Sequence, residues 1–124
     1  MNKTILIIDD EQQLLKLVSM LLSQKGFQVE TAVDGVEGIE KLKSQQFNLI
    51  ICDLNMPRLD GIGVIKKARS SGIDTPFIFF TGHGNETLMI ESLKFGARGF
   101  INKPHFDNLE KLIDEILPPT KDSE

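Results

Sequence analysis

Three aspartates and one lysine each follow a short apolar run of the chain, at Asp9, Asp10, Asp53 and Lys103. A carboxylate at the end of a hydrophobic strand adds nothing to a core, so we expect Asp53 to be placed there for chemistry. Three carboxylates and one ammonium leave a formal charge of −2 (three negative, one positive), which a divalent cation would neutralise. The donors are hard oxygens without a Cys/His cluster. This set favours Mg²⁺, with Mn²⁺ as the other possibility, and excludes zinc.

Such a site suits the transfer of a phosphoryl group onto Asp53. The metal and Lys103 would neutralise charge on the transferring group while the Asp53 carboxylate attacks in line, which forms an aspartyl-phosphate. Thr81 ends another apolar run, and its hydroxyl can donate a hydrogen bond to the bound phosphoryl group.

The elements that position these residues are short apolar runs that alternate with helical patterns. Nearly continuous hydrophobic runs at 5–8, 48–52 and 77–80 predict strands covered on both faces. The weaker runs at 28–32 and 99–102 predict flanking strands. Five strand-then-helix units indicate an α/β fold with a doubly wound, five-stranded parallel sheet, five flanking helices and right-handed crossovers.

Helix boundaries are marked by capping residues and by breakers. Asp34 (with Glu37), Asp60 and Asn85 are candidate N-caps, while Lys25-Gly26 and Pro118-Pro119 predict helix ends. Apolar side chains recur at helical spacing in five groups: Leu14, Val18, Leu21 and Leu22; Val36, Ile39 and Leu42; Val64, Ile65 and Ala68; Met89, Ile90 and Leu93; Leu109, Leu112, Ile113 and Ile116.

The predicted sheet places every candidate residue at one edge. In doubly wound sheets, sites form at the carboxyl ends of the strands. The acids, Thr81 and Lys103 all end or follow strands, so they are expected to converge there.

Composition limits the class of protein. The chain has 124 residues, 40% hydrophobic and 26% charged, which predicts one soluble domain over residues 1–119 and a short flexible tail at 120–124. A net charge of −4 argues against binding to nucleic acid. The single Cys52 fits a reducing compartment, and the chain shows no signal peptide and no membrane-spanning run. We therefore expect a cytoplasmic protein without membrane contact.

The chain resembles the receiver domain of bacterial two-component response regulators from about residue 3 to residue 117. Four motifs in order carry the resemblance: Asp9-Asp10, Asp53-x-x-Met56-Pro57-x-x-Asp60-Gly61, Thr81-Gly82 and Lys103-Pro104. The resemblance implies a flavodoxin-like sheet with strand order 2-1-3-4-5. It also implies a stand-alone switch that takes a phosphoryl group from a histidine kinase or histidine phosphotransfer protein.

The resemblance also implies roles for individual residues. Asp53 would be the phosphoacceptor, with Lys103 paired to the phosphoryl group. Asp10, Asp53 and the backbone carbonyl of Asn55 would hold Mg²⁺, with Asp9 acting mainly through water.

Further implied roles concern the switch and the lifetime of the phosphoryl group. Thr81 and Phe100 would form the switch, and Asn55 and His83 would tune the phosphoryl lifetime. Output would pass to a protein target through the face made by the fourth helix, the fifth strand and the fifth helix.

Three other classes are weighed against this one. A phosphatase of the haloacid-dehalogenase type needs a second acid two residues after the nucleophile, where this chain has Asn55. An acidic pocket would repel the phosphate of a flavin. An unphosphorylated docking module would not need the full set of acids, threonine and lysine. We therefore expect a protein that catalyses only its own phosphorylation and dephosphorylation.

Overall fold

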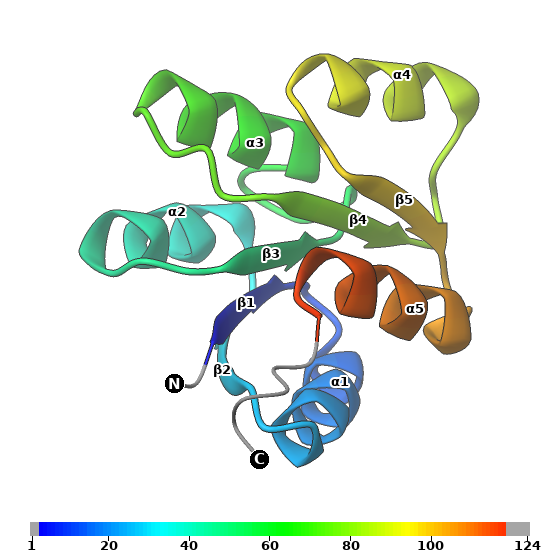
Figure 1. Cartoon of the computed structure of the whole chain (residues 1–124). Coiled ribbons are helices and arrows are strands. Elements are labelled where there is room, and N and C mark those ends of the chain that lie inside the picture. Colours follow the sequence, from blue (N-terminus) through cyan, green and yellow to red (C-terminus); the bar gives the residue numbers. More distant parts are fainter. Residues whose placement is uncertain (1–2, 119–124) are drawn as a thin grey trace.

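Strands and helices alternate along residues 3–118, the part of the chain that the computed structural model describes. Their order is β1 (Thr4–Ile8), α1 (Gln12–Gln24), β2 (Gln28–Ala32), α2 (Gly35–Ser44), β3 (Leu49–Cys52), α3 (Gly61–Ser70), β4 (Phe77–Thr81), α4 (Glu86–Lys94), β5 (Gly99–Asn102) and α5 (Phe106–Ile116). The strands form one parallel sheet in the order β2-β1-β3-β4-β5, so the predicted fold and topology are confirmed (Figure 1). The predicted tail at 120–124 lies outside the described residues, as does Pro119.

The three inner strands are the most apolar part of the chain and are buried throughout β3 and β4. Their register aligns Ile8 with Cys52 and Cys52 with Phe79, and Thr81 aligns with Asn102 on β5. Because all the strands run in one direction, the residues that follow them emerge at one edge of the sheet.

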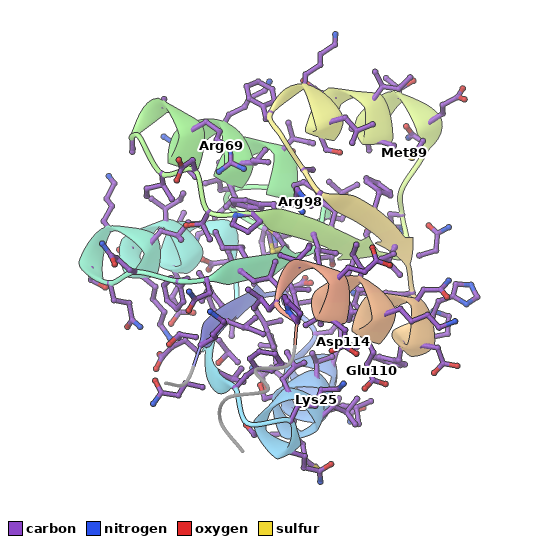
Figure 2. All side chains as sticks on the ribbon, viewed as in Figure 1. Lys25, Arg69, Met89, Arg98, Glu110 and Asp114 are labelled. Carbon is purple, nitrogen blue, oxygen red and sulfur yellow. The ribbon has the colours of Figure 1, made fainter. Side chains whose placement is uncertain are left out.

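Two helical layers cover the two faces of the sheet (Figure 1). α1 and α5 pack on one face, where Val18 and Ile113 belong to the same apolar cluster. α2, α3 and α4 pack on the other, around Val64 and Ile65. Figure 2 shows Lys25, which directly follows α1, beside α5, where its ammonium lies 3.3 Å from Glu110 and 3.5 Å from Asp114. None of the helices within residues 3–118 combines the length and the hydrophobicity needed to span a bilayer.

The predicted N-caps of α2, α3 and α4 are confirmed. The side chains of Asp34, Asp60 and Asn85 accept hydrogen bonds from backbone N–H groups three residues later, at 2.8, 2.8 and 2.9 Å. Glu37 accepts from the N–H of Val33, one residue earlier than in a standard capping box. α1 ends at Gln24, and Lys25 caps it ahead of Gly26, which has a φ of 96°, so the predicted helix end at Lys25-Gly26 is confirmed.

α4 differs from the predicted amphipathic pattern. Met89, Ile90 and Leu93 are exposed by 36%, 49% and 53%, so they do not form the face that meets the sheet. That face is made by Leu88, Ser92 and Phe95, of which Ser92 is fully buried. Ser92 is accommodated because its hydroxyl donates to the carbonyl of Met89 at 2.7 Å.

Candidate functional site

The carboxyl edge of the sheet gathers the residues that the sequence singles out. Asp9 and Asp10 follow β1, Asp53 follows β3, Thr81 ends β4 and Lys103 follows β5. Carboxylate oxygens of the three aspartates lie within 4.8 Å of one another. Asp9 and Asp53 are buried and Asp10 is exposed, so the cluster opens to solvent on the Asp10 side.

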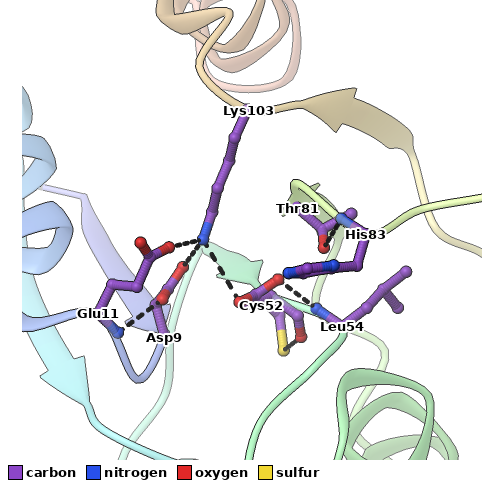
Figure 3. Close-up of polar contacts among 8 residues, drawn as sticks. Asp9, Glu11, Cys52, Leu54, Thr81, His83 and Lys103 are labelled. Carbon is purple, nitrogen blue, oxygen red and sulfur yellow. Dashed lines mark hydrogen bonds and ion pairs between the residues drawn. The ribbon is translucent and has the colours of Figure 1, made fainter.

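The Lys103 side chain reaches across this edge to three carboxylates (Figure 3). Its ammonium lies 2.9 Å from Asp9, 3.4 Å from Asp53 and in direct hydrogen-bond contact with Glu11. Burial disfavours the charged ammonium, but the hydrogen bonds to Glu11 and Asp9 and the nearby carboxylate charges outweigh it, so the pKa of Lys103 is raised. Lys103 is therefore a permanent positive charge in the site.

Asp9 is tied into the protein rather than directed at solvent. One of its oxygens accepts from the backbone N–H of Glu11 at 2.9 Å, and the other faces Lys103. Burial raises the pKa of Asp9 to about 6, against the opposing effects of the Glu11 hydrogen bond and of Lys103. The charge of Asp53 adds to the rise.

Asp53 is held by the backbone on both sides. Its N–H donates to the carbonyl of Ile8 at 2.9 Å, and its Oδ1 accepts from the N–H of Leu54 at 2.7 Å. The loop that follows returns so closely that a Cβ at Gly61 would lie 2.3 Å from the Asp53 carbonyl oxygen. Only glycine fits there, so the absence of a side chain at Gly61 allows the close backbone contact that helps to position Asp53.

A cavity of about 440 Å³ opens in front of the Asp53 carboxylate. Its lining comprises Asp10, Glu11, Asp53, Asn55, Gly82, His83 and Lys103. The predicted site residues Asn55 and His83 therefore belong to the same cavity as the acids and the lysine. A phosphoryl group has room to approach Asp53 from this side.

Thr81 and Phe100 do not line this cavity, whose lining is defined by residues 3–118. Thr81 is fully buried, and its hydroxyl oxygen accepts from the N–H of His83 at 3.1 Å. The Phe100 ring packs on Phe79, with ring centroids 6.2 Å apart, and against Gly84 of the β4–α4 loop. These contacts connect the threonine, the aromatic ring and the loop between β4 and α4.

Sequence reasoning missed Glu11, which the structure places at the rim of the cavity in contact with Lys103. The available signal was its position directly after Asp9-Asp10, in a run of three acids. With Glu11 included, the site contains four carboxylates and one ammonium, and the formal charge becomes −3 (four negative, one positive). Cys52 behaves as expected for a core residue: burial raises the pKa of its thiol, whose Sγ lies 3.2 Å from the carbonyl oxygen of Asp53.

The donor set fits a hard divalent cation. The closely grouped carboxylates carry the charge that Mg²⁺ prefers, and the cavity they border leaves room for water ligands. Asp10 is the exposed acid of the group, whereas Asp9 is already engaged by Lys103 and Glu11. Asp10 is therefore the acid of the group that is most open to a cation.

Comparison with known proteins places this site in a large family. Residues 5–116 match the family model of the response regulator receiver domain. The chain is similar to the transcriptional regulatory protein DltR of Streptococcus agalactiae, with 32% identity over 119 residues. That match covers 96% of this chain and 52% of DltR, so the chain spans about half the length of this relative.

Solved structures of receiver domains and response regulators share this fold. A CheY-like receiver domain protein from Methanospirillum hungatei has a TM-score of 0.86 and 31% identity, with 94% of each chain covered. The response regulator TrrA of Thermotoga maritima, solved in complex with Mg²⁺ and BeF, has a TM-score of 0.82 and 28% identity. That match covers 92% of this chain and 98% of TrrA.

Proposed function

Because the chain belongs to the receiver-domain family of response regulators, a family of phosphorylation-activated switches, we propose that Asp53 is its phosphoacceptor. One observation carries the proposal: Asp53 is a buried, strand-end carboxylate that borders an open cavity shared with Asp10 and Lys103. No other residue of this cavity combines a carboxylate held by the backbone with direct contact to the lysine.

The reaction forms a bond between an Asp53 carboxylate oxygen and phosphorus while the bond from phosphorus to its donor breaks. Leu54 N–H holds Oδ1, which fixes the carboxylate plane, and Lys103 lies on the Oδ2 side. Asp10, Asp53 and the Asn55 carbonyl would hold Mg²⁺, with Asp9 contributing through water. Bound there, the ion would supply charge neutralisation for the transferring group.

The phosphoryl donor in this proposal is a histidine kinase or a histidine phosphotransfer protein. The exposed Asp10 and the open cavity give such a donor access to Asp53. Turnover is limited to the chain's own phosphorylation and dephosphorylation. Asn55 and His83 border the cavity where a hydrolytic water would approach, which supports their role in setting phosphoryl lifetime.

The switch in this proposal runs from Thr81 to Phe100. The Thr81 hydroxyl oxygen accepts from the N–H of His83, so a turn of the hydroxyl toward a phosphoryl group on Asp53 would change its contact with the β4–α4 loop. Phe100 contacts that loop through Gly84 and responds to it. The exposed apolar side chains of α4, namely Met89, Ile90 and Leu93, support an output face formed by α4, β5 and α5 that binds a protein target.

The same proposal places the protein in the cytoplasm, because phosphotransfer from a histidine kinase takes place there. The free and buried Cys52 thiol is compatible with a reducing compartment. The phosphatase alternative is not favoured by the family match, and Asn55 stands where that class needs its second acid.

The test is the incorporation of phosphate from acetyl phosphate in the presence of Mg²⁺. Wild type should take up one phosphoryl group per chain with little sustained phosphate release. Asp53→Asn should take up none, and Lys103→Ala should be labelled but respond poorly at Phe100. Asp74→Asn, an exposed aspartate away from the cavity, is the matched control and should label normally. Stoichiometric labelling of Asp53→Asn at the same site would overturn the assignment of Asp53 as the phosphoacceptor.

A further inference from the structure

The Lys103 ammonium has three N–H donors, and in this structure three carboxylates lie within ion-pair distance of it. The contact with Asp53 is the longest of the three, at 3.4 Å, against 2.9 Å for Asp9, and Glu11 is in direct contact. Lys103 is therefore drawn toward Glu11 and Asp9 and away from the acceptor. A phosphoryl group on Asp53 has to recruit this ammonium from partners that already hold it.

The two competing partners differ in how firmly they are placed. The Asp9 side chain is 3% exposed and is also held by the N–H of Glu11, so it cannot leave Lys103 without structural change. The Glu11 side chain is 61% exposed at the rim of the cavity. Ion pairs with an exposed member are weak and are readily exchanged for water. Glu11 is the partner that can be displaced.

We propose that Glu11 is a positioning residue that holds Lys103 in the unphosphorylated protein and yields it to the incoming phosphoryl group. No bond to Glu11 forms or breaks in this exchange. The Lys103 ammonium turns from one anionic oxygen to another, and the Glu11 carboxylate moves into solvent. Glu11 would thereby weaken the binding of a phosphoryl group or its mimic. The inference rests on the proposed phosphorylation of Asp53.

The experiment measures the affinity of beryllofluoride in the presence of saturating Mg²⁺, followed by NMR because the chain contains no Trp. Glu11→Gln keeps the shape and removes the charge. It should bind beryllofluoride about twofold to fivefold more tightly than wild type, the range expected from losing one exposed ion pair. Glu115→Gln removes an equal charge from the exposed end of α5 and should match wild type.

Two further variants separate contact with Lys103 from simple charge repulsion. Glu11→Asp keeps the charge but is one methylene shorter, so it should lose the Lys103 contact and behave like Glu11→Gln. In a Lys103→Met background, replacing Glu11 by Gln should give no gain. A gain that persists without Lys103, or Glu11→Asp behaving like wild type, would show that only the charge matters and would overturn the inference.

The outcome for wild type distinguishes the two proposals. If wild type binds beryllofluoride at Asp53 and Glu11→Gln binds it equally well, the role of Glu11 is wrong and the phosphoacceptor assignment stands. If wild type does not bind beryllofluoride at all, both are overturned.

Discussion

The surroundings of Asp9 oppose the ionisation of its carboxyl group. Its pKa is raised to about 6, first because burial removes the charged form from water. An aspartate in an unfolded chain has a pKa of about 3.9. The folded protein therefore binds this proton more tightly than the unfolded chain does. Below about pH 4, Asp9 is protonated in both states and does not lower the free energy of unfolding. As the pH rises from about 4 to about 6, the unfolded chain loses this proton first, so the free energy of unfolding falls, and it falls no further above that range.

This linkage predicts the behaviour of Asp9→Asn, which resembles the protonated form. Without metal at pH 7, we expect the variant to be more stable than wild type by about 1 to 3 kcal/mol. The advantage should shrink toward zero as the pH falls to about 4, where wild-type Asp9 is protonated. Urea unfolding at several pH values, with chelator present, measures the difference. An advantage independent of pH would contradict the assigned shift.

At the scale of elements, the loop between β4 and α4 holds two glycines in different surroundings. A Cβ at Gly84 would lie 2.2 Å from Cε1 and 2.6 Å from Cζ of Phe100, whereas a Cβ at Gly82 would meet nothing within 4 Å. The Phe100 ring can occupy its place only because residue 84 has no side chain. The loop and the aromatic ring are therefore coupled by direct contact.

Gly84→Ala should destabilise the protein by about 1 to 3 kcal/mol, because the methyl group forces the ring or the loop to move. Gly82→Ala is the matched control and should leave stability unchanged or slightly higher. Replacing Phe100 by Ala should remove most of the penalty of Gly84→Ala, which a double-mutant cycle in urea would show. Equal penalties with and without the Phe100 ring would rule out the contact as the cause.

α4 gives a second prediction at this scale, because three of its apolar side chains, Met89, Ile90 and Leu93, are exposed to solvent. Leu93→Ala on the exposed face should change the free energy of unfolding by no more than about 0.5 kcal/mol. Leu109→Ala, at a buried position of α5, should lower it by about 2 to 5 kcal/mol. Denaturant titration of the two variants compares the positions directly. A large loss for Leu93→Ala would mean that α4 buries the face that contains Leu93.

At the scale of the whole molecule, the parallel sheet concentrates negative charge at one edge. Carboxylates of Asp9, Asp10 and Asp53 lie together although β1 and β3 contribute them from distant parts of the chain. Their mutual repulsion opposes folding in the absence of metal. A cation that binds only the folded protein stabilises it by mass action.

We therefore expect Mg²⁺ to raise the melting temperature of wild type at constant ionic strength. Asp10→Asn should be more stable than wild type without metal, by about 1 kcal/mol for an exposed member of the cluster, and should gain little from Mg²⁺. Calorimetry with and without chelator tests both statements. Equal Mg²⁺-dependent shifts in the two proteins would count against a metal site at this edge.

The fold and the meeting of the strand-end acids with Lys103 follow from the sequence. Alternating apolar runs and helical patterns define a doubly wound parallel sheet. In such a sheet, residues that end strands share one edge, so the meeting of Asp53 and Lys103 was predictable without coordinates. The N-caps at Asp34, Asp60 and Asn85 were predictable because capping is local, acting over three residues.

Two features were decided only by tertiary structure. α4 has apolar residues on more than one side, and its periodicity does not say which side meets the sheet; packing selected Leu88 and Ser92 and left Leu93 in solvent. The pairing of Glu11 with Lys103 joins residues 92 positions apart. It depends on where the crossovers place the start of α1 relative to the loop after β5, and that geometry has no local signature in the chain.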